Sequence, residues 1–492
     1  MVTGAPSSAG NHSGCDAVGS RPLGKSMLYA VSGMGLFHAC QFGVIILLRK
    51  FAPAEVLGQV LFSLAIATPV IVFCSLELRG ALVADAAGEF TFGTYRRLRS
   101  LTVMIAGAIL LGMVAWQALT EPRLAYIIIL AGLCAGKLIV SLAEIGWGLF
   151  QKRERLDLMA TSAAMRGLGM ILPFALLIPL CAWWSGSATA TVDQMANSTA
   201  FAVVIYVAVS IAILFVFDRR CVAMRPDYDP AWTWRAVGRL ARQTFPLGIV
   251  LLILHLCNSI PQLVIEHQPN GKAALGYFGA LTFVTMAGNL LVFQAANAGA
   301  NRLAHYYQTD LAAFLRLGGR LLGLALVVGL LLLGGTLLFG EWLLRVLYRP
   351  EDAGYYHEFK IIVAAQCLAL LTNVFGVLTT QMRLFWLQVP AQVIVLLCTA
   401  TAAFLFIPSA TNLVYGGACT LLVRSGVHVA LYGGCVCFGL FMRRRVLAAR
   451  VSLPADRARI PVVDTGPAFP PDGDSSDTAP RVPDEHRGPA DS

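Results

Sequence analysis

Charge is the first thing that this sequence lacks. Only 13% of its 492 residues are Asp, Glu, Lys or Arg, whereas a soluble domain normally carries about 25%. The hydrophobic fraction is correspondingly high, at 57%, and the mean hydropathy is +0.70. Short strands of alternating polarity, which a membrane β-barrel would need, are also missing. The composition excludes a soluble protein and favours an all-α integral membrane protein.

Several chemical signatures are absent as well. There is no GxxxxGK[ST] loop, so the chain does not hydrolyse ATP by that route. The twelve cysteines are scattered, and the close pair Cys435 and Cys437 points to different sides of a helix. The longest segment predicted outside the membrane, 341–358, leaves little room for a catalytic domain. We therefore predict no enzyme activity, no catalytic residues, no cofactor and no metal.

What is present is a series of apolar windows, each about twenty residues long, the length that crosses a bilayer. They predict twelve membrane-spanning helices. Arg and Lys are unevenly distributed over the connecting segments, with 23 on the side of the N-terminus and seven on the other side. Because positive residues concentrate in cytoplasmic loops, both termini are predicted to be cytoplasmic, in a multi-pass protein of the inner membrane. The predicted spans are 27–48, 55–78, 101–119, 124–149, 158–183, 196–217, 244–266, 273–298, 318–340, 359–382, 385–407 and 412–441.

The spans fall into two sets of six, and short matches between the sets indicate an internal repeat. His38-Ala-Cys-Gln41 in the first span corresponds to His255-Leu-Cys-Asn258 in the seventh, and Leu57-Gly58 corresponds to Leu275-Gly276. Parallel repeats of this kind are related by an axis along the membrane normal. The predicted organisation is a disordered cytoplasmic leader (1–26), an N-lobe (27–217), a cytoplasmic inter-lobe loop (218–243), a C-lobe (244–442), and a basic juxtamembrane segment with a disordered cytoplasmic tail (443–492).

Ionisable residues inside spans are costly, so they usually face the bundle interior or an aqueous cavity. Lys137 and Glu144 share a face of one span, and Arg166 lies on the next span. At ~1.5 Å per residue, Glu144 lies ~9 Å, Arg166 ~14 Å and Lys137 ~20 Å from the inner end. One interpretation is a structural ion pair between Arg166 and Glu144. The other is a net positive site in which Lys137 and Arg166 bind an anionic head group.

Arg424 is the strongest candidate for a cation in a cavity, because no acidic residue of its span can neutralise it. His428 follows it by one helical turn. The candidates for coupling or cavity lining are His428, Glu144, and His38 and His255 with their neighbouring amides Gln41 and Asn258, although a histidine in a span is more often a packing residue. Asn289 could line a hydrophilic lumen or could pin helices together. No acidic residue lies near the middle of a span, the usual device for coupling to protons or sodium.

The loop after the second span resembles that of a known family. The span ends in Leu76-x-Leu78-Arg79 and is followed by Asp85, by Glu89-Phe90-x-Phe92-Gly93-x-Tyr95 and by Arg99; the first outer turn reads Leu48-Arg49-x-Phe51-x-Pro53-x-Glu55-x-x-Gly58. Both are similar to Wzx-type polysaccharide-biosynthesis flippases of the multidrug/oligosaccharidyl-lipid/polysaccharide (MOP) superfamily. The resemblance implies two six-helix lobes in a MATE-like V around a cationic cavity. It also implies transfer of an undecaprenyl-diphosphate-linked oligosaccharide across the inner membrane.

The predicted function is therefore that of a flippase, working by alternating access. The resemblance carries over no fixed set of substrate-binding residues, so Arg424, Arg166 and Lys137 are predicted from depth and charge. The expected partners are a lipid-linked anionic glycan, membrane lipids and polysaccharide polymerase or assembly proteins, without nucleic acid. Arg96, Arg97 and Arg99 are expected to contact anionic lipid. The alternatives are a cation-coupled multidrug exporter, which would need an acidic cavity, and a non-catalytic scaffold of an envelope-glycan assembly complex.

Overall fold

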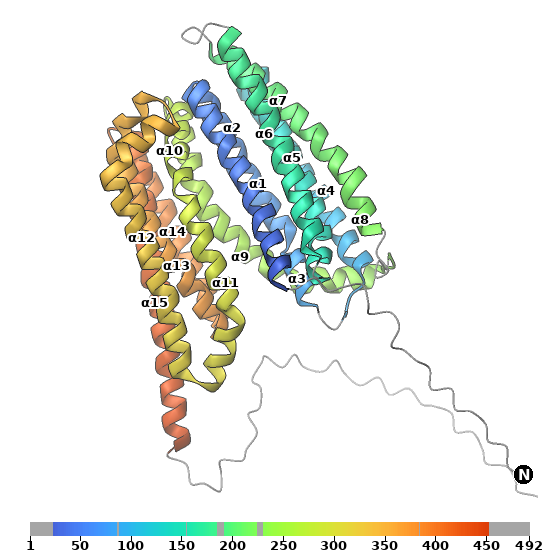
Figure 1. Cartoon of the computed structure of the whole chain (residues 1–492), viewed down its shortest axis with the longest axis vertical. Helices are drawn as coiled ribbons and strands as arrows, with labels where there is room; N and C mark the ends of the chain where they lie inside the picture. Colours follow the sequence, from blue (N-terminus) through green and yellow to red (C-terminus); the bar gives the residue numbers. More distant parts are fainter. Residues whose placement is uncertain are drawn as a thin grey trace, which may run out of the picture. The chain divides into compact units, whose positions relative to one another are not determined.

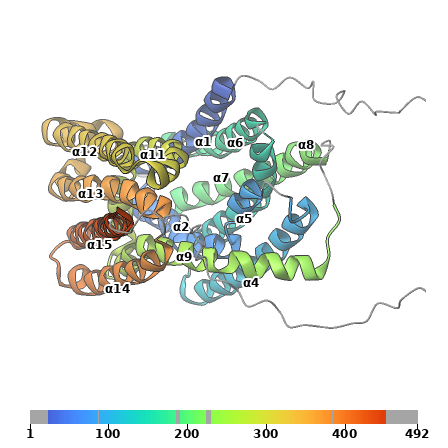
Figure 2. The same cartoon turned by 90° about the horizontal axis from the view of Figure 1, so that it is seen from below.

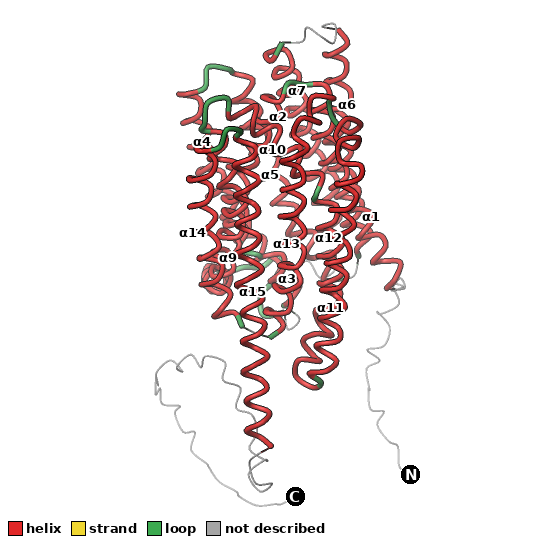
Figure 3. The backbone as a smooth tube through the Cα atoms, turned by 90° about the vertical axis from the view of Figure 1, so that its left-hand side faces the viewer, coloured by secondary structure: helices red, strands yellow, loops and turns green. Residues whose placement is uncertain are grey.

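Every regular element that the structure describes is a helix (Figure 3). The computed structural model describes residues 23–85, 88–153, 155–184, 191–223, 230–382 and 384–451. The predicted leader lies outside the described residues as far as residue 22, and the predicted tail lies outside them from residue 452. Helix α1 begins at Leu23, so the last residues assigned to the leader are helical, and the basic segment from Arg443 to Val451 continues α15.

The first eight α-helices belong to the predicted N-lobe and the inter-lobe loop; they are α1 (Leu23–Phe51), α2 (Ala54–Ser75), α3 (Leu78–Ala84), α4 (Phe92–Thr120), α5 (Leu124–Lys152), α6 (Leu156–Trp184), α7 (Val192–Ile213), continued by a π-helix (Leu214–Asp218), and α8 (Arg219–Ala223). The second set consists of α9 (Trp234–Glu266), α10 (Gly271–Val284), α11 (Met286–Thr309), α12 (Leu311–Leu347), a 3-10 turn (Pro350–Tyr355), α13 (Tyr356–Gln381), α14 (Phe385–Ser409) and α15 (Leu413–Val451).

Eleven helical segments in the described ranges are long and apolar enough to cross a membrane, compared with twelve predicted spans. The predicted span 273–298 corresponds to α10 and α11, which meet at Thr285. Helix α10 has only 14 residues, and at ~1.5 Å per residue it is too short to cross about 30 Å of hydrocarbon. The count of twelve and the orientation remain predictions, and we use "inner" and "outer" for the two ends as predicted.

The two sets of helices meet where α1, α2 and α4 of the first contact α9 and α10 of the second. Within the first set, α1 packs against α6, and α5 packs against α2, α4 and α7; within the second, α13 packs against α11 and α12, and α14 packs against α9 (Figures 1 and 2). Helix α2 contacts both α9 and α10, and α4 also reaches α9.

At the inner end, α9 starts earlier than predicted. The Thr233 hydroxyl accepts a hydrogen bond from the backbone N–H of Ala236 (3.2 Å) and caps the helix inside the segment 218–243 that was predicted as a loop. The Thr91 hydroxyl, in the loop that resembles the flippase family, donates to the carbonyl of Ala231 (2.5 Å). The guanidinium of Arg97 lies 4.7 Å from the ring centre of Trp232. This loop therefore packs against Ala231 and Trp232, the residues directly before α9.

Arg99 shows that one lipid contact was wrongly predicted. Its side chain is buried in the N-lobe, where its guanidinium lies 3.2 Å from the carboxylate of Glu144. A buried, paired arginine cannot contact lipid head groups. The stretch of charge between the second and third predicted spans thus serves, in part, to tie helices together.

The outer end is closed by a contact that the repeat anticipates. A Cβ atom on Gly58 of α2 would overlap the carbonyl of Lys272, and a Cβ atom on Gly276 of α10 would overlap the carbonyl of Ala54. Gly58 lies four residues after Ala54, and Gly276 lies four residues after Lys272, so each helix offers a carbonyl to the glycine of the other. The contact is therefore reciprocal, as a two-fold relation between α2 and α10 requires.

An ion pair reinforces this contact. Arg49, at the end of α1, is fully buried and lies 2.5 Å from the carboxylate of Asp352 and 3.1 Å from that of Glu351. The guanidinium also stacks over the ring of Tyr277 in α10, 4.6 Å from its centre. Because both carboxylates belong to the turn before α13, this cluster ties the N-lobe to the C-lobe at the outer end.

Candidate functional site

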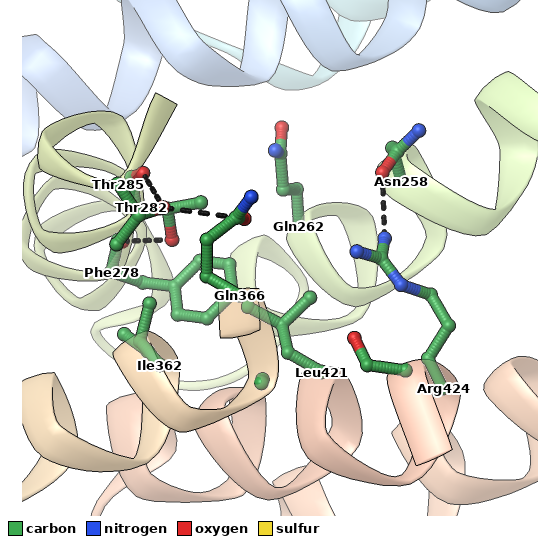
Figure 4. Close-up of a pocket in the computed structure, with 11 residues that line it drawn as sticks. Asn258, Gln262, Phe278, Thr282, Thr285, Ile362, Gln366, Leu421 and Arg424 are labelled. Atoms are coloured by element: carbon green, nitrogen blue, oxygen red, sulfur yellow. Dashed lines mark hydrogen bonds between the residues drawn. The ribbon is translucent and has the colours of Figure 1, made fainter. Parts of the chain in front are cut away.

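A polar pocket lies among α9, α10, α13 and α15, in the predicted C-lobe (Figure 4). It contains about 420 Å³ of empty space, part of it open to solvent. Its wall combines the apolar side chains of Phe278, Ile362 and Leu421 with neutral polar groups and one cation, Arg424. Among the described residues, no carboxylate lines it. The neutral polar residues of the wall are Asn258, Gln262, Thr282, Thr285, Gln366 and Ser425.

Arg424 enters this pocket from α15 and is held by neutral acceptors. Its Nη1 donates to the side-chain oxygen of Asn258 at 2.6 Å (Figure 4) and to the carbonyl of Cys257 at 3.3 Å. In the described ranges, no Asp or Glu lies within ion-pair distance of this guanidinium. Its positive charge is therefore oriented but not neutralised.

The other predicted residue of α15 extends the polar surface towards the inner end. The His428 ring packs edge-on against the ring of Tyr432, with 4.8 Å between their centres. The Tyr432 hydroxyl in turn donates to the side-chain oxygen of Gln392 on α14 (3.3 Å). His428 is thus one turn from Arg424 and outside the pocket itself.

Lys137 brings a second cation to α9 from the N-lobe. It lies on α5 and is half-buried, and no hydrogen bond or ion pair connects it to another described residue. Its ammonium charge interacts electrostatically with the carboxylate of Glu144 on the same helix and with the imidazole of His255. His255 and Asn258 are three residues apart and share a face of α9. The structure therefore places His255 and the Arg424 partner Asn258 on one face of α9, with Lys137 acting on His255 only through its charge.

Arg166 does not join this group. It is fully buried, and its Nη2 lies 2.5 Å from the carboxylate of Asp218. The same carboxylate accepts a hydrogen bond from the hydroxyl of Ser162 (2.6 Å), which accepts one from the indole N–H of Trp147 (2.9 Å). The predicted ion pair between Arg166 and Glu144 is wrong, because Glu144 pairs with a different arginine.

Asp218 is the charged residue that the sequence analysis missed. It was placed at the first position of the inter-lobe loop, but the helix continues through a π-helical turn at Leu214–Asp218 and on to Ala223. Two further atoms of Arg166, Nε and Nη1, are buried without a partner in the described structure. Arg166 is therefore held in the protein by a single carboxylate. The signal that could have located Asp218 is the apolar run Leu214–Phe217, which continues the span up to it.

The remaining predicted residues lie apart from the pocket. On α1, the exposed ring of His38 contacts the side-chain oxygen of Gln41, with 3.3 Å between His38 Nδ1 and Gln41 Oε1. Asn289 on α11 accepts a hydrogen bond from the side-chain amide of Asn373 on α13. Of the two roles predicted for Asn289, this contact is the one that pins helices together.

Comparison with known proteins identifies one relative by sequence and several solved structures with a similar fold. No family model matches the chain. The chain is 22% identical over 400 residues, which cover 80% of this chain and 94% of the relative, to "capsular polysaccharide biosynthesis protein CapF" of Staphylococcus aureus. Among solved structures, an inward-facing multidrug-resistance MATE transporter of the MOP superfamily has a TM-score of 0.64 at 12% identity, covering 88% of this chain and all of that one.

A second solved structure is the lipid II flippase MurJ in an inward closed conformation. Its TM-score is 0.60 at 10% identity, over 86% of this chain and 93% of that chain. The fold is that of the MOP-superfamily transporters, and the chain is a multi-pass membrane protein. The predicted resemblance to the polysaccharide-biosynthesis members of this superfamily is confirmed.

Proposed function

We propose that this protein moves an undecaprenyl-diphosphate-linked oligosaccharide from the inner to the outer leaflet of the cell inner membrane. In this proposal, Arg424 and Lys137 contact the diphosphate while the lipid tail stays in the bilayer. The observation that carries the proposal is the environment of Arg424, a guanidinium inside the bundle whose direct hydrogen-bond partners are neutral.

The energetic argument concerns the missing acid. A charge inside the hydrocarbon region is costly unless it is paired or faces water, and such residues usually mark a substrate path. A bound diphosphate would supply the negative charge that the protein does not. Arginine suits this role because it remains protonated and its planar fork can donate two hydrogen bonds to phosphate oxygens. Lys137 adds a second cation, which makes no ion pair with a described residue but interacts through its charge with Glu144 and His255.

The comparisons support the same substrate class. The curated relative carries a name from capsular polysaccharide biosynthesis, and one structural neighbour is described as a lipid II flippase. Polysaccharide polymerase or other assembly proteins of the inner membrane are the partners that such a substrate implies. The shared fold with multidrug transporters alone would allow an exporter of organic cations. An unneutralised arginine would repel such a substrate.

The test is leaflet transfer of a fluorescent undecaprenyl-diphosphate oligosaccharide in proteoliposomes. Wild type, Arg424→Gln and Lys137→Gln are compared with Arg345→Gln, which removes an exposed cation paired within its own helix. We expect wild type and Arg345→Gln to transfer the lipid, and each of the other two to be at least tenfold slower.

Transfer at the wild-type rate by both Arg424→Gln and Lys137→Gln would remove these residues from the proposal. Absence of transfer by wild type, over a panel of lipid-linked glycans, would overturn the function. Fluorescence-monitored melting of each variant shows whether a loss of transfer comes from a loss of folding.

A further inference from the structure

The neutral part of the C-lobe pocket is not explained by phosphate binding. We propose that it is a saccharide subsite, which binds the first sugar of the lipid-linked head group while Arg424 binds the neighbouring phosphate. This inference rests on the proposed function and specifies which part of the substrate the site recognises. Its basis is a set of polar groups in the pocket that have no partner within the described protein.

The clearest of these groups is the amide of Gln366. Its Nε2 is buried without a hydrogen-bond partner, while its Oε1 accepts a hydrogen bond from the hydroxyl of Thr285 at 3.5 Å (Figure 4). The side-chain amide of Gln262 and the hydroxyl of Ser425 also make no hydrogen bond to any described residue. A buried amide N–H without a partner costs free energy. It is therefore a position where a ligand oxygen would be stabilised.

The chemistry of the wall fits a neutral sugar. Side-chain amides and hydroxyls both donate and accept hydrogen bonds, as sugar hydroxyls do. Phe278 and Leu421 also line the pocket, but both are buried, so the polar groups make up most of its accessible wall. Because no carboxylate of the described structure lines the pocket, a positively charged amino sugar has no counter-charge there.

The position of the pocket relative to Arg424 selects the first sugar. Asn258, which accepts the hydrogen bond from Arg424, and Gln262 are one helical turn apart on α9. Four residues correspond to ~6 Å along the helix axis. A phosphate held at Arg424 would therefore place the sugar directly attached to it beside Gln262 and Gln366. Sugars further along the chain would lie beyond the pocket.

The experiment measures binding to the purified full-length protein in detergent, by microscale thermophoresis. Three probes are used: undecaprenyl diphosphate, the same lipid carrying one N-acetylhexosamine, and the free N-acetylhexosamine. The variants are Gln262→Met/Gln366→Met, which keeps side-chain length but removes both amides, and Arg424→Gln. Gln388→Met is the matched control, because Gln388 bonds to Thr379 on the neighbouring α13, away from the pocket.

We expect wild type and Gln388→Met to bind the sugar-bearing lipid roughly tenfold more tightly than the bare lipid, the effect of about two net hydrogen bonds. The double variant should lose this preference while its affinity for bare undecaprenyl diphosphate stays within twofold of wild type. Arg424→Gln should bind both lipids more weakly. Melting temperatures within about 2 °C of wild type would show that the double variant is folded.

Three results would overturn the subsite. One is equal affinity of wild type for the two lipids, and another is an unchanged preference in the double variant; both leave the proposed function standing if the lipid is still transferred. The third is binding of the free sugar as tightly as the sugar-bearing lipid, which would point to a soluble saccharide instead. If wild type binds neither lipid, the proposed function fails and the subsite fails with it.

Discussion

Arg166 and Arg424 are both arginines inside the helix bundle, one in each lobe, and their surroundings differ in one respect. Arg166 is fully buried against the carboxylate of Asp218, at 2.5 Å. Arg424 is half-buried and held by the amide oxygen of Asn258 and a backbone carbonyl. The first charge is compensated within the protein, whereas the second remains available. A buried arginine is therefore a candidate for substrate binding only when no carboxylate of the protein pairs with it, and this has to be checked in the structure.

The two arginines should also differ in how much their removal lowers the stability of the fold. Breaking a buried ion pair by removing one partner leaves an uncompensated charge and is strongly destabilising. Removing a cation that has only neutral partners leaves two ordinary acceptors, which water can satisfy in a partly open pocket. Arg166 should therefore matter for folding and Arg424 for transport.

The largest effect is expected when the N-lobe pair is made to resemble the C-lobe arrangement. Asp218→Asn keeps the shape but removes the counter-charge of Arg166, and it should lower the free energy of unfolding by about 3–5 kcal/mol. The measurement is thermal unfolding in detergent, with Asp193→Asn, an exposed carboxylate, as the control. A rescue by Arg166→Met/Asp218→Leu should restore near wild-type stability. An unchanged melting temperature in Asp218→Asn would contradict the assignment.

The converse change gives Arg424 the acid that it lacks. Asn258→Asp keeps the acceptor position but neutralises the guanidinium, so transfer of a lipid diphosphate should fall at least tenfold, which corresponds to about 1.4 kcal/mol. Stability should be retained or should rise. Asn270→Asp, at an exposed turn where φ is +58°, is the matched control. Wild-type transfer rates in Asn258→Asp would show that the charge of Arg424 does not act on the substrate.

A smaller effect is expected for the second acid-paired arginine of the N-lobe. Arg99 is 2% exposed, but its partner Glu144 is 35% exposed, so water can partly replace the carboxylate. Glu144→Gln should therefore cost about 1–2 kcal/mol of stability. Glu341→Gln, in an exposed pair, should cost less than about 0.5 kcal/mol. The stability of all variants is measured by melting in one detergent. If Glu144→Gln loses as much stability as Asp218→Asn, burial of the ion pair does not determine the size of the loss.

The smallest effect concerns Asp85, a carboxylate just outside the membrane-spanning segments. Burial alone would raise the pKa of Asp85, but hydrogen bonds from the backbone N–H groups of Glu89 and Phe90, the charge of Lys152 and the Tyr95 hydroxyl hold it below its usual range. The ionised form therefore stabilises the folded state, and this stabilisation is lost as the pH falls below about 4.

Asp85→Asn should accordingly cost under about 1 kcal/mol at pH 7. It should also flatten the fall in stability between pH 5 and pH 3, measured by melting over that range. A pH profile that is identical in wild type and Asp85→Asn would show that Asp85 does not contribute. High salt should reduce the difference, because the carboxylate is near the surface.

Most of the helical architecture could be predicted from the sequence, because apolar windows of bilayer length report burial in lipid directly. The break at Thr285 was not predicted, since the apolar pattern continues across it into α11. The early start of α9 was missed because its first turns, from Trp234, carry charged and aromatic residues that resemble a loop by hydropathy.

The site was predicted in part, for a physical reason. That Arg424 lacks an acid within its own span is visible in the sequence, and the structure adds that its direct hydrogen-bond acceptors are neutral. The partner of Arg166 was not predictable from depth alone, since depth does not say which face of α6 points to α7. The neutral wall of the pocket comes from four helices, and only tertiary packing brings Gln262 and Gln366 together.

The reciprocal glycine contact at the outer end constrains how this chain can vary. Gly58 and Gly276 each face the backbone of the other lobe, so a methyl group added to either one would push the same two helices apart. Gly319 and Gly323 have open space beside them and are free of this restriction. At the contact between α2 and α10, both halves of the sequence must therefore keep a glycine.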